Sequence, residues 1–350
     1  MSRSAPFGFL ACNKPRGMTS REVVNHVQRR LQLELGVRRL KVGHTGTLDP
    51  LADGIVVVAV GPATRLTPWM LQHAKRYRGR FQLGVCSVSG DLEQPVTARP
   101  ELPMPTVSQL TSVSESLRGW VEQIPPAHSA VWVNGQRAYD RTRRGESVEM
   151  PTRQVWLGDV RVIDFQPPDL EVDVLCGSGT YLRSLGIDLA ARCGTVAVMT
   201  ALTRTNVGPL TLKEAVPAER FQTPPMHQLD ERQREEIASA TETRLLDQLH
   251  PPAPMLGHLP QLKLSEEDVV RVRNGLCVTD DPIPGGTTWC VPGKGSEEKP
   301  TRAGPRRADS EPSEESRGDA VAVDPRGGLV AVMRRKRSMW CPYRVFPAAI

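Results

Sequence analysis

The stretch Lys41-Val-Gly-His-Thr-Gly-Thr-Leu-Asp-Pro-Leu-Ala-Asp-Gly54 runs directly into the apolar segment Ile55-Val-Val-Val-Ala-Val60. A continuous apolar run of this length, closed by Gly61-Pro62, is typical of a strand that is buried on both faces. The sequence therefore predicts a loop rich in glycine and hydroxyl groups at the edge of a core strand. Loops supported by a rigid scaffold often carry binding or catalytic residues.

Asp49, within this loop, has two interpretations. Aspartate before proline commonly forms a turn, because its carboxylate bonds nearby backbone amides and proline fixes the next φ. Taken alone, the Asp-Pro pair favours the turn by roughly four to one. Its neighbours favour a functional site, since His44, Thr45 and Thr47 lie close by and three glycines permit a ligand to approach the backbone.

The string Gly43-His-Thr-Gly-Thr-Leu-Asp-Pro-Leu-Ala-Asp-Gly54 closely resembles the signature of the TruB family of tRNA pseudouridine synthases. The resemblance implies that Asp49 is the catalytic residue. Asn13-Lys-Pro-Arg-Gly-Met-Thr-Ser20 resembles the opening motif of the same family, and Cys176-Gly-Ser-Gly-Thr-Tyr-Leu-Arg183 resembles its second signature.

The resemblance assigns roles to three further residues. Arg183 matches an arginine that pairs with the catalytic aspartate, and an adjacent guanidinium favours the charged carboxylate in a closed base pocket. Tyr77 occupies the place of a tyrosine that packs against the target uracil. Leu202, in Met199-Thr-Ala-Leu-Thr-Arg204, occupies that of a leucine lining the uracil pocket.

Each candidate also has a purely structural interpretation. From pattern alone, Tyr77 is a core residue of a half-buried strand by roughly two to one, and Leu202 is core. Arg183 alone would be a surface arginine in a first helical turn, where the helix dipole disfavours cations. Lys14 is a candidate for substrate contact whose alternative is a solvated turn lysine. His44 fits a loop or RNA contact better than an acid–base group.

The segment Lys75–Gly84 predicts a strand with Tyr77 on one face and three arginines, at 76, 78 and 80, on the other. Aromatic rings interleaved with cations suit a nucleic-acid surface. The loop that follows, Val85–Glu93, departs from the acidic Thr-Asp-Thr-x-Asp pattern of many relatives, and Asp91 receives no role. A helix is predicted from Val107 to Trp120.

Residues 123–152 resemble the mobile insertion with which the family clamps the T-arm of tRNA. Four arginines give this segment the positive charge that a phosphate clamp needs. They are Arg137, Arg141, Arg143 and Arg144.

Length, charge and composition limit the number of domains, the kind of partner and the location of the protein. The chain has 350 residues, which is enough for two domains. Its net charge of +6 has the sign of a nucleic-acid binder but is also compatible with DNA, an acidic protein or no such partner. No apolar run reaches the length of a membrane span and no signal-peptide pattern opens the chain, so we expect a cytoplasmic protein without a membrane partner.

The seven cysteines include no Cys-x-x-Cys pair, and no cluster of histidines accompanies them at metal-ligand spacing. Zinc and a disulfide framework are therefore both unexpected. The cysteines are interpreted as reduced thiols.

The predicted fold class is α+β, and the resemblance implies a pseudouridine synthase core with a central mixed, largely antiparallel sheet flanked by helices and loops. A capped helix over 265–275 and a β-hairpin over 321–333 resemble a small C-terminal PUA-like β domain. A polar stretch poor in aliphatic residues is predicted to be a disordered insertion. The expected parts are a catalytic domain at 1–221, a linker at 222–260, the PUA-like domain at 261–350 and the insertion at 293–318.

The resemblance implies an enzyme that isomerises uridine to pseudouridine at position 55 in the T-loop of tRNA. No metal or cofactor is expected, and tRNA is the expected partner of a monomer that needs no obligatory protein partner. Two alternatives stay open. The same chemistry could act on rRNA or mRNA, or with a guide RNA; or the chain could be a non-catalytic RNA-binding module or RNA-folding chaperone.

Overall fold

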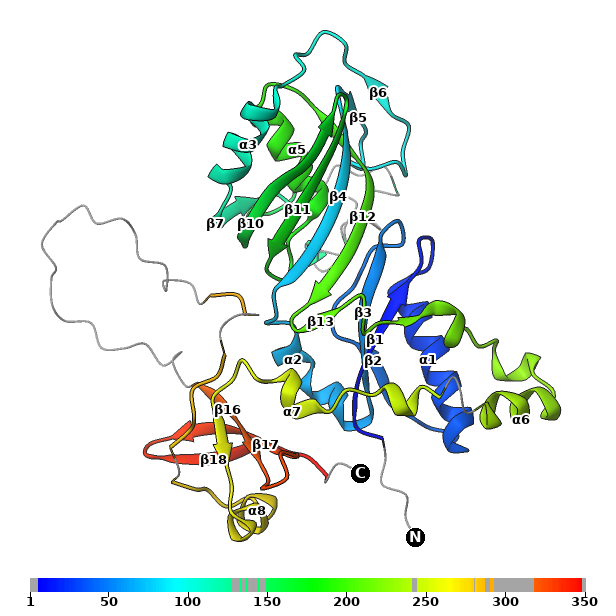
Figure 1. The fold of residues 1–350 in the computed structure, drawn as a ribbon, viewed down its shortest axis with the longest axis vertical. Coiled ribbons are helices and arrows are strands. Elements are labelled where there is room, and N and C mark those ends of the chain that lie inside the picture. The colour runs from blue at the N-terminus through cyan, green and yellow to red at the C-terminus, as the bar shows by residue number, and fades with distance from the viewer. Residues whose placement is uncertain are drawn as a thin grey trace, which may run out of the picture.

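The computed structural model describes residues 6–126, 132–133, 136–137, 141, 144, 149–240, 244–279, 281–286, 290–292 and 318–347. A mixed ten-stranded sheet runs along most of the long axis of this part of the chain (Figure 1). Its strands are β1 (Gly8–Lys14), β2 (Val42–His44), β3 (Asp53–Val60), β4 (Lys75–Leu83), β7 (Gly119–Gln123), β10 (Arg153–Gln166), β11 (Asp169–Cys176), β12 (Ala197–Val207), β13 (Leu210–Thr211) and β14 (Val216–Pro217).

The strand order is β14-β1-β3-β12-β4-β11-β10-β7, with β2 paired to β3 and β13 to β12. The β1–β14 and β3–β12 pairs are parallel and the others are antiparallel. The expected mixed, largely antiparallel sheet is therefore confirmed. Two short pairs lie outside it, β5 (Val85–Cys86) with β6 (Thr97–Ala98) and β8 (Trp132–Val133) with β9 (Gln136–Arg137).

Strand β3 is buried on both faces, as its unbroken apolar sequence predicts. Val56, Val58 and Val60 join one hydrophobic cluster, which also contains the apolar face of helix α1. The alternate residues, including Ile55 and Val57, join a second cluster on the opposite face. Successive side chains of a strand point to opposite faces. A strand that lies between two hydrophobic cores therefore carries apolar residues at every position, and does not alternate between apolar and polar ones.

The described helices are α1 (Ser20–Leu35), α2 (Thr67–Met70), α3 (Val107–Ser116), α5 (Leu182–Arg192), α6 (Glu231–Ser239), α7 (Pro252–Met255) and α8 (Glu266–Arg273). Thr19 and Glu22 form the capping box at the start of α1. The helix predicted over 107–120 is too long by four residues. Gly119 adopts a φ of 94°, and Trp120 belongs to β7, which pairs with β10.

The C-terminal sheet has the order β15 (Gln261–Lys263), β16 (Asp319–Val323), β17 (Leu329–Lys336) and β18 (Met339–Val345). The predicted hairpin is the antiparallel β16–β17 pair, and the predicted capped helix is α8, which begins after Ser265. This small sheet, with α8 beside it in Figure 1, is consistent with a PUA-like domain. Its predicted insertion lies outside the described residues except for Gly318.

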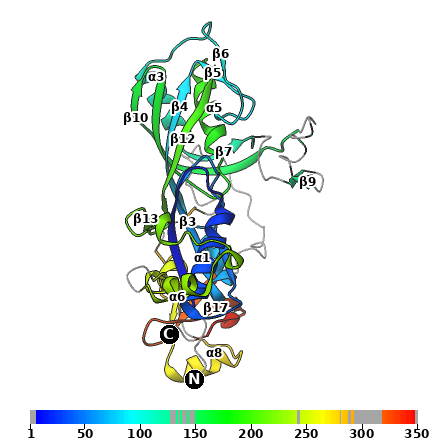
Figure 2. The ribbon, with the colours of Figure 1, turned by 90° about the vertical axis from the view of Figure 1, so that its right-hand side faces the viewer.

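The C-terminal sheet packs against the N-terminal part of the chain. The rings of Phe7 and Phe346 are stacked with centroids 5.3 Å apart. Trp69 Nε1 donates a hydrogen bond to Asp319 at 3.0 Å. Both contacts border the second hydrophobic cluster, which contains residues of β3 as well as of β16 and β17. The N-terminal strands and the C-terminal sheet, which follow one another along the long axis in Figure 2, therefore share a hydrophobic core.

The expectation that all cysteines are reduced is wrong for one pair. Cys277 and Cys341 form a disulfide across 64 residues of sequence, with Cα atoms 4.2 Å apart. Val278 and Trp340 exchange backbone hydrogen bonds, so the neighbouring cysteines occupy the closely spaced positions of an antiparallel pair. Sequence spacing does not reveal this pairing. Within the described residues no helix has the length and apolarity needed to cross a bilayer.

Gly54 generates a prediction, because it is where β3 lies closest to β12. Its φ is +102°, and a Cβ there would lie 2.3 Å from the carbonyl oxygen of Arg204. We expect Gly54→Ala to lower the free energy of unfolding by about 3 kcal/mol or more, measured by chemical denaturation. Gly43→Ala is the control, since a Cβ at Gly43 meets no atom within 4 Å. Equal stability of the two variants would contradict a close approach of Gly54 to Arg204.

Candidate active site

Residues 45–52 connect β2 to β3 and carry Asp49. Backbone and hydroxyl groups hold this loop on both sides of the aspartate. Ser20 Oγ donates to the carbonyl of Leu48 at 2.9 Å and accepts from its amide at 2.8 Å. The amide of Gly17 donates to the carbonyl of Pro50 at 2.7 Å. The residues that begin α1 therefore fix the position of the loop.

The side chain of Asp49 is not used by the turn that contains it. The backbone carbonyl of Asp49 accepts the amide of Ala52 at 3.1 Å, which closes the turn. The carboxylate lies 3.3 Å from Arg183 Nη2, and the side chain is 44% exposed. The turn and the functional interpretation therefore both hold, because different groups of Asp49 serve them.

Arg183 lies between two carboxylates. It is the second residue of α5, and its side chain is 7% exposed. Its Nη1 atom lies 3.1 Å from Asp91, which is 4% exposed, and donates to the carbonyl of Ser89 at 3.2 Å. These two acceptors on the loop after β4 hold the guanidinium, and they leave Nη2 directed at Asp49.

Asp91 is a site residue that the sequence left without a role. Its carboxylate accepts hydrogen bonds from Ser89 Oγ at 2.6 Å and from the amide of Glu93 at 3.0 Å. Asp91 also forms a bridge with Met199 of β12. The feature of the sequence that could have indicated this role is the presence of an acidic residue in a loop that otherwise departs from the family pattern.

Tyr77 and Leu202 lie on the same face of the sheet, on neighbouring strands. Tyr77 of β4 pairs in register with Arg204 of β12, and Leu202 pairs with Gly79. Both side chains are largely buried within the first hydrophobic cluster. Burial raises the pKa of Tyr77, and the nearby carboxylate of Asp49 adds to this effect more weakly. The structure thus brings Tyr77, Leu202 and the Asp49 loop together, as the sequence predicts.

Arg204 is a second residue that the sequence reasoning missed. It is 2% exposed, and its guanidinium donates to three backbone carbonyls. Nε contacts Ile55 at 2.6 Å, Nη1 contacts Thr47 at 3.0 Å and Nη2 contacts Gly46 at 3.2 Å. Nη1 also lies 3.5 Å from the hydroxyl of Tyr77. Arg204 therefore ties the loop that carries Asp49 to the strand that carries Tyr77. The sequence could have indicated this role, because Arg204 is a charged residue two positions after Leu202 and therefore lies on the same buried face of the strand.

Lys14 requires a correction, because it is neither a solvated turn lysine nor placed to contact substrate. It is fully buried, and its ammonium group donates to the carbonyls of Met18 at 2.8 Å and Pro15 at 3.0 Å. It also donates to Ala52 and, at 3.4 Å, to Pro50. Burial lowers its pKa to about 8. Lys14 anchors the loop beyond Asp49.

His44 lies at the end of β2, immediately before the loop. Its Nδ1 atom is buried and has no hydrogen-bond partner within the described part of the chain. Burial lowers its pKa, and the charges of Arg204 and Arg21 lower it further. Because Nδ1 is closed off from solvent, it is not the atom that would meet RNA, and the expected contact of His44 with RNA stays a prediction.

Comparison with known proteins decides the family. The model of the TruB family pseudouridylate synthase N-terminal domain matches residues 31–182. A tRNA pseudouridine synthase B from Rhodopirellula baltica is 42% identical over 356 residues, which cover 98% of this chain and 95% of that protein. Another from Synechococcus sp. (strain WH7803) is 39% identical over 76% of this chain and 82% of its own length. The chain belongs to the TruB family.

Members of this family are enzymes that isomerise uridine to pseudouridine in tRNA. The fold agrees with this membership. The structure titled "Crystal Structure of a Cbf5-Nop10-Gar1 Complex" superposes with a TM-score of 0.63 at 20% identity, over 99% of this chain and 85% of that one. At this identity the similarity concerns the fold alone.

The clamp expected in TruB enzymes is only partly described. Strands β8 and β9 pair, and β9 stands away from the sheet in Figure 2. Arg141 and Arg144 are described, and Arg144 Nη2 donates to Gln136 Oε1 at 2.7 Å. Arg143 and the side chain of Arg137 lie outside the described residues. The role of the four arginines stays a prediction.

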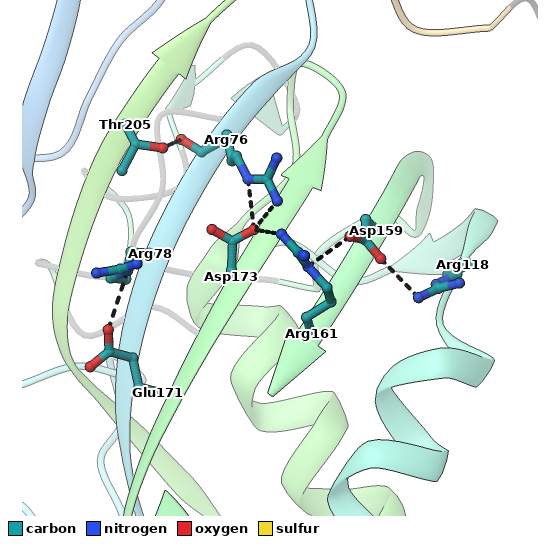
Figure 3. A network of polar contacts seen from close by, with 8 residues as sticks. All are labelled: Arg76, Arg78, Arg118, Asp159, Arg161, Glu171, Asp173 and Thr205. Atoms are coloured by element: carbon teal, nitrogen blue, oxygen red, sulfur yellow. Dashed lines mark hydrogen bonds and ion pairs between the residues drawn. The ribbon is translucent and has the colours of Figure 1, made fainter. Parts of the chain in front are cut away.

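The arginines of β4 lie on the face of the sheet opposite to Tyr77, as the alternation predicts. Carboxylates of β11 hold them in ion pairs, of which Figure 3 shows those of Arg76 and Arg78. On β4 the pairs are Arg76–Asp173 at 2.7 Å, Arg78–Glu171 at 3.3 Å and Arg80–Glu171 at 3.0 Å. Two arginines outside β4 extend this network, through Arg161–Asp173 at 3.2 Å, Arg161–Asp159 at 3.0 Å and Arg118–Asp159 at 2.9 Å. Whether this strand contributes to a nucleic-acid surface stays a prediction.

The lowered pKa of Lys14 predicts a pH-dependent stability. The ordinary pKa of 10.5 exceeds the folded value of about 8, so between these values the unfolded chain binds the proton more tightly. The contribution of Lys14 therefore rises with pH over this window, by up to about 3 kcal/mol. The measurement is the difference in free energy of unfolding between the wild type and Lys14→Met at several pH values. With exposed Lys41→Met as the control, a flat difference for Lys14→Met would contradict this assignment.

Arg204 predicts a positioning effect on turnover. Arg204→Lys keeps the charge, but one ammonium cannot reach three separated carbonyls and the Tyr77 hydroxyl. We expect kcat to fall about 100-fold, because a small displacement of the catalytic loop is costly, while KM changes little. Arg78→Lys is the matched control on the other face of the sheet. An equal loss of kcat in both variants, or a loss confined to KM, would argue against a positioning role.

Proposed function

We propose that this protein isomerises the uridine at position 55 in the T-loop of tRNA, with Asp49 as its catalytic residue. The observation that carries the proposal is the geometry of Asp49, a carboxylate that is open to solvent on one side and ion-paired with buried Arg183 on the other. The substrate follows from relatives that are named tRNA pseudouridine synthase B over nearly the whole chain.

The reaction breaks the bond between C1′ and N1, turns the uracil and joins C1′ to C5. The proton on C5 is released and N1 gains one, so the product is an isomer and no electrons are exchanged. Asp49 could attack C1′, attack C6 or remove a sugar proton. Each route needs a charged carboxylate at the base and sugar, and the adjacent guanidinium of Arg183 favours that charge.

Tyr77 and Leu202 supply the apolar part of the proposed uracil site. Stacking of a base on an aromatic ring contributes about 1–3 kcal/mol, whereas extruding a nucleotide costs a few kcal/mol. Stacking alone therefore does not offset extrusion. Phosphate contacts must add to it, which is the role we assign to the arginines of the 123–152 segment, namely Arg137, Arg141, Arg143 and Arg144.

The protein would act on tRNA in the cytoplasm as a monomer, without an obligatory protein partner. A net charge of +6 supports binding to RNA without a helper subunit. Cbf5, which shares the fold, was crystallised in a complex with Nop10 and Gar1. An unmodified tRNA transcript incubated with the protein alone separates these two modes of action.

The test is release of tritium from T-arm RNA carrying 5-labelled uridine. We expect the wild type to release one tritium per target uridine and Asp49→Asn to release none, with a Kd for the RNA within about threefold of wild type. Asp169→Asn, which makes the same chemical change at an exposed position, should retain full turnover.

Three results would overturn parts of this proposal. Turnover by Asp49→Asn at the wild-type rate would remove Asp49 from the mechanism. Release from an rRNA hairpin but not from the T-arm would replace the substrate. Tight binding of tRNA without release by the wild type would identify a non-catalytic RNA-binding protein.

A further inference from the structure

Three potential metal ligands converge at a place that the active site does not use. His73 lies just before β4, His258 follows α7, and Cys290 belongs to the described stretch 290–292. One side-chain ligand atom from each residue lies within 4.8 Å of the other two. The backbone supports this approach, because His73 and Cys290 form an antiparallel bridge and the amide of Val291 donates to Gln72 at 3.2 Å.

The imidazole of His258 is the first sign that a ligand belongs here. Both of its ring nitrogens are buried, and neither has a hydrogen-bond partner within the described residues. Leaving a buried polar group unsatisfied costs about 1–3 kcal/mol. The ring of His258 instead packs edge-on against His73, with centroids 4.6 Å apart. A bound cation would satisfy one of these nitrogens.

The hydrogen bonding of His73 fits the same interpretation. Its Nε2 atom lies 2.8 Å from the carbonyl oxygen of Met255. A carbonyl only accepts, so Nε2 carries the proton. Histidines that bind metals commonly donate their other ring N–H to a backbone carbonyl, which fixes the ring and its tautomer. His73 is 2% exposed, so its ring is firmly held.

The donor set indicates which metal would bind. Two imidazoles and a thiolate are poor ligands for Mg²⁺ or Ca²⁺, which prefer oxygen, and good ligands for Zn²⁺. Bond lengths of 2.0–2.1 Å to nitrogen and 2.3 Å to sulfur place two tetrahedral nitrogens and one sulfur about 3.3–3.6 Å apart. The widest separation of 4.8 Å therefore has to close by about 1 Å, which side-chain rotation can supply.

We propose that His73, His258 and Cys290 bind one zinc ion, with water or one further ligand in the fourth position. The ion would tie together three segments that are distant in sequence. The first is the turn that leads into β4, which is the strand that carries Tyr77. The second is the connection that leads from α7 to the C-terminal sheet, and the third is the stretch 290–292. Because the unfolded chain does not hold these ligands together, zinc would stabilise the fold. We assign it a structural role, since the hydrogen bonds and ion pairs described above for Asp49, Arg183 and Tyr77 involve none of these three ligands.

The experiment uses the full chain after removal of metal with a chelator. Zinc is titrated in competition with a chromophoric chelator, and Co²⁺ is added separately, because tetrahedral cobalt bound to thiolate has an intense charge-transfer band. We expect one zinc per chain, a higher Tm with zinc, and the cobalt–sulfur band. Cys290→Ser should abolish the band and weaken zinc binding by at least about 100-fold, and His258→Gln should also weaken binding while keeping the band.

Cys193→Ser and Cys277→Ser are the controls. The first removes a free thiol elsewhere in the chain, and the second tests whether a cysteine released from the disulfide is the true ligand. Both should bind zinc as the wild type does. A wild-type protein that binds no zinc beyond the level of Cys290→Ser would overturn the proposal, as would a cobalt–sulfur band that survives in Cys290→Ser but is lost in Cys277→Ser.

Discussion

One buried guanidinium joined to two carboxylates is the interaction on which the site depends. Burying a charge is costly unless its partner and hydrogen bonds are well placed. Arg183 meets this condition through Asp91 and the carbonyl of Ser89, and Asp91 in turn accepts from Ser89 Oγ and Glu93. The buried pair is therefore satisfied without Asp49. The second carboxylate can remain partly exposed beside a fixed positive charge, which is what a group that must meet substrate requires.

Strand β12 brings the remaining parts into register. It pairs with β4 along most of its length and with β3 at Gly54, so it contacts both the strand of Tyr77 and the strand that follows the catalytic loop. Arg204 uses this position, because a side chain between two strands can reach carbonyls of the loop and the tyrosine hydroxyl at once. On the opposite face, carboxylates of β11 offset the charges of the β4 arginines (Figure 3).

The sequence predicted those features that depend on neighbouring residues. The apolar run of β3, the capping box at Thr19 and the β16–β17 hairpin all follow from local patterns. Roles that arise from tertiary contact were not predictable in this way. Lys14 ends strand β1 and precedes Pro15, so it looks like a turn residue, yet it is buried among carbonyls 36 and 38 positions away. Asp91 and the disulfide partner of Cys277 were missed for the same reason.

The two faces of β3 explain how the loop that carries Asp49 is placed relative to the C-terminal sheet. One face joins the cluster that contains Tyr77 and Leu202, and the other joins the cluster that contains Val321 and Phe346. Protein interiors are close-packed, so neither core can shift without opening contacts along this strand. The loop begins where β2 ends and leads directly into β3. Its position relative to the C-terminal sheet is therefore set by the packing of one strand.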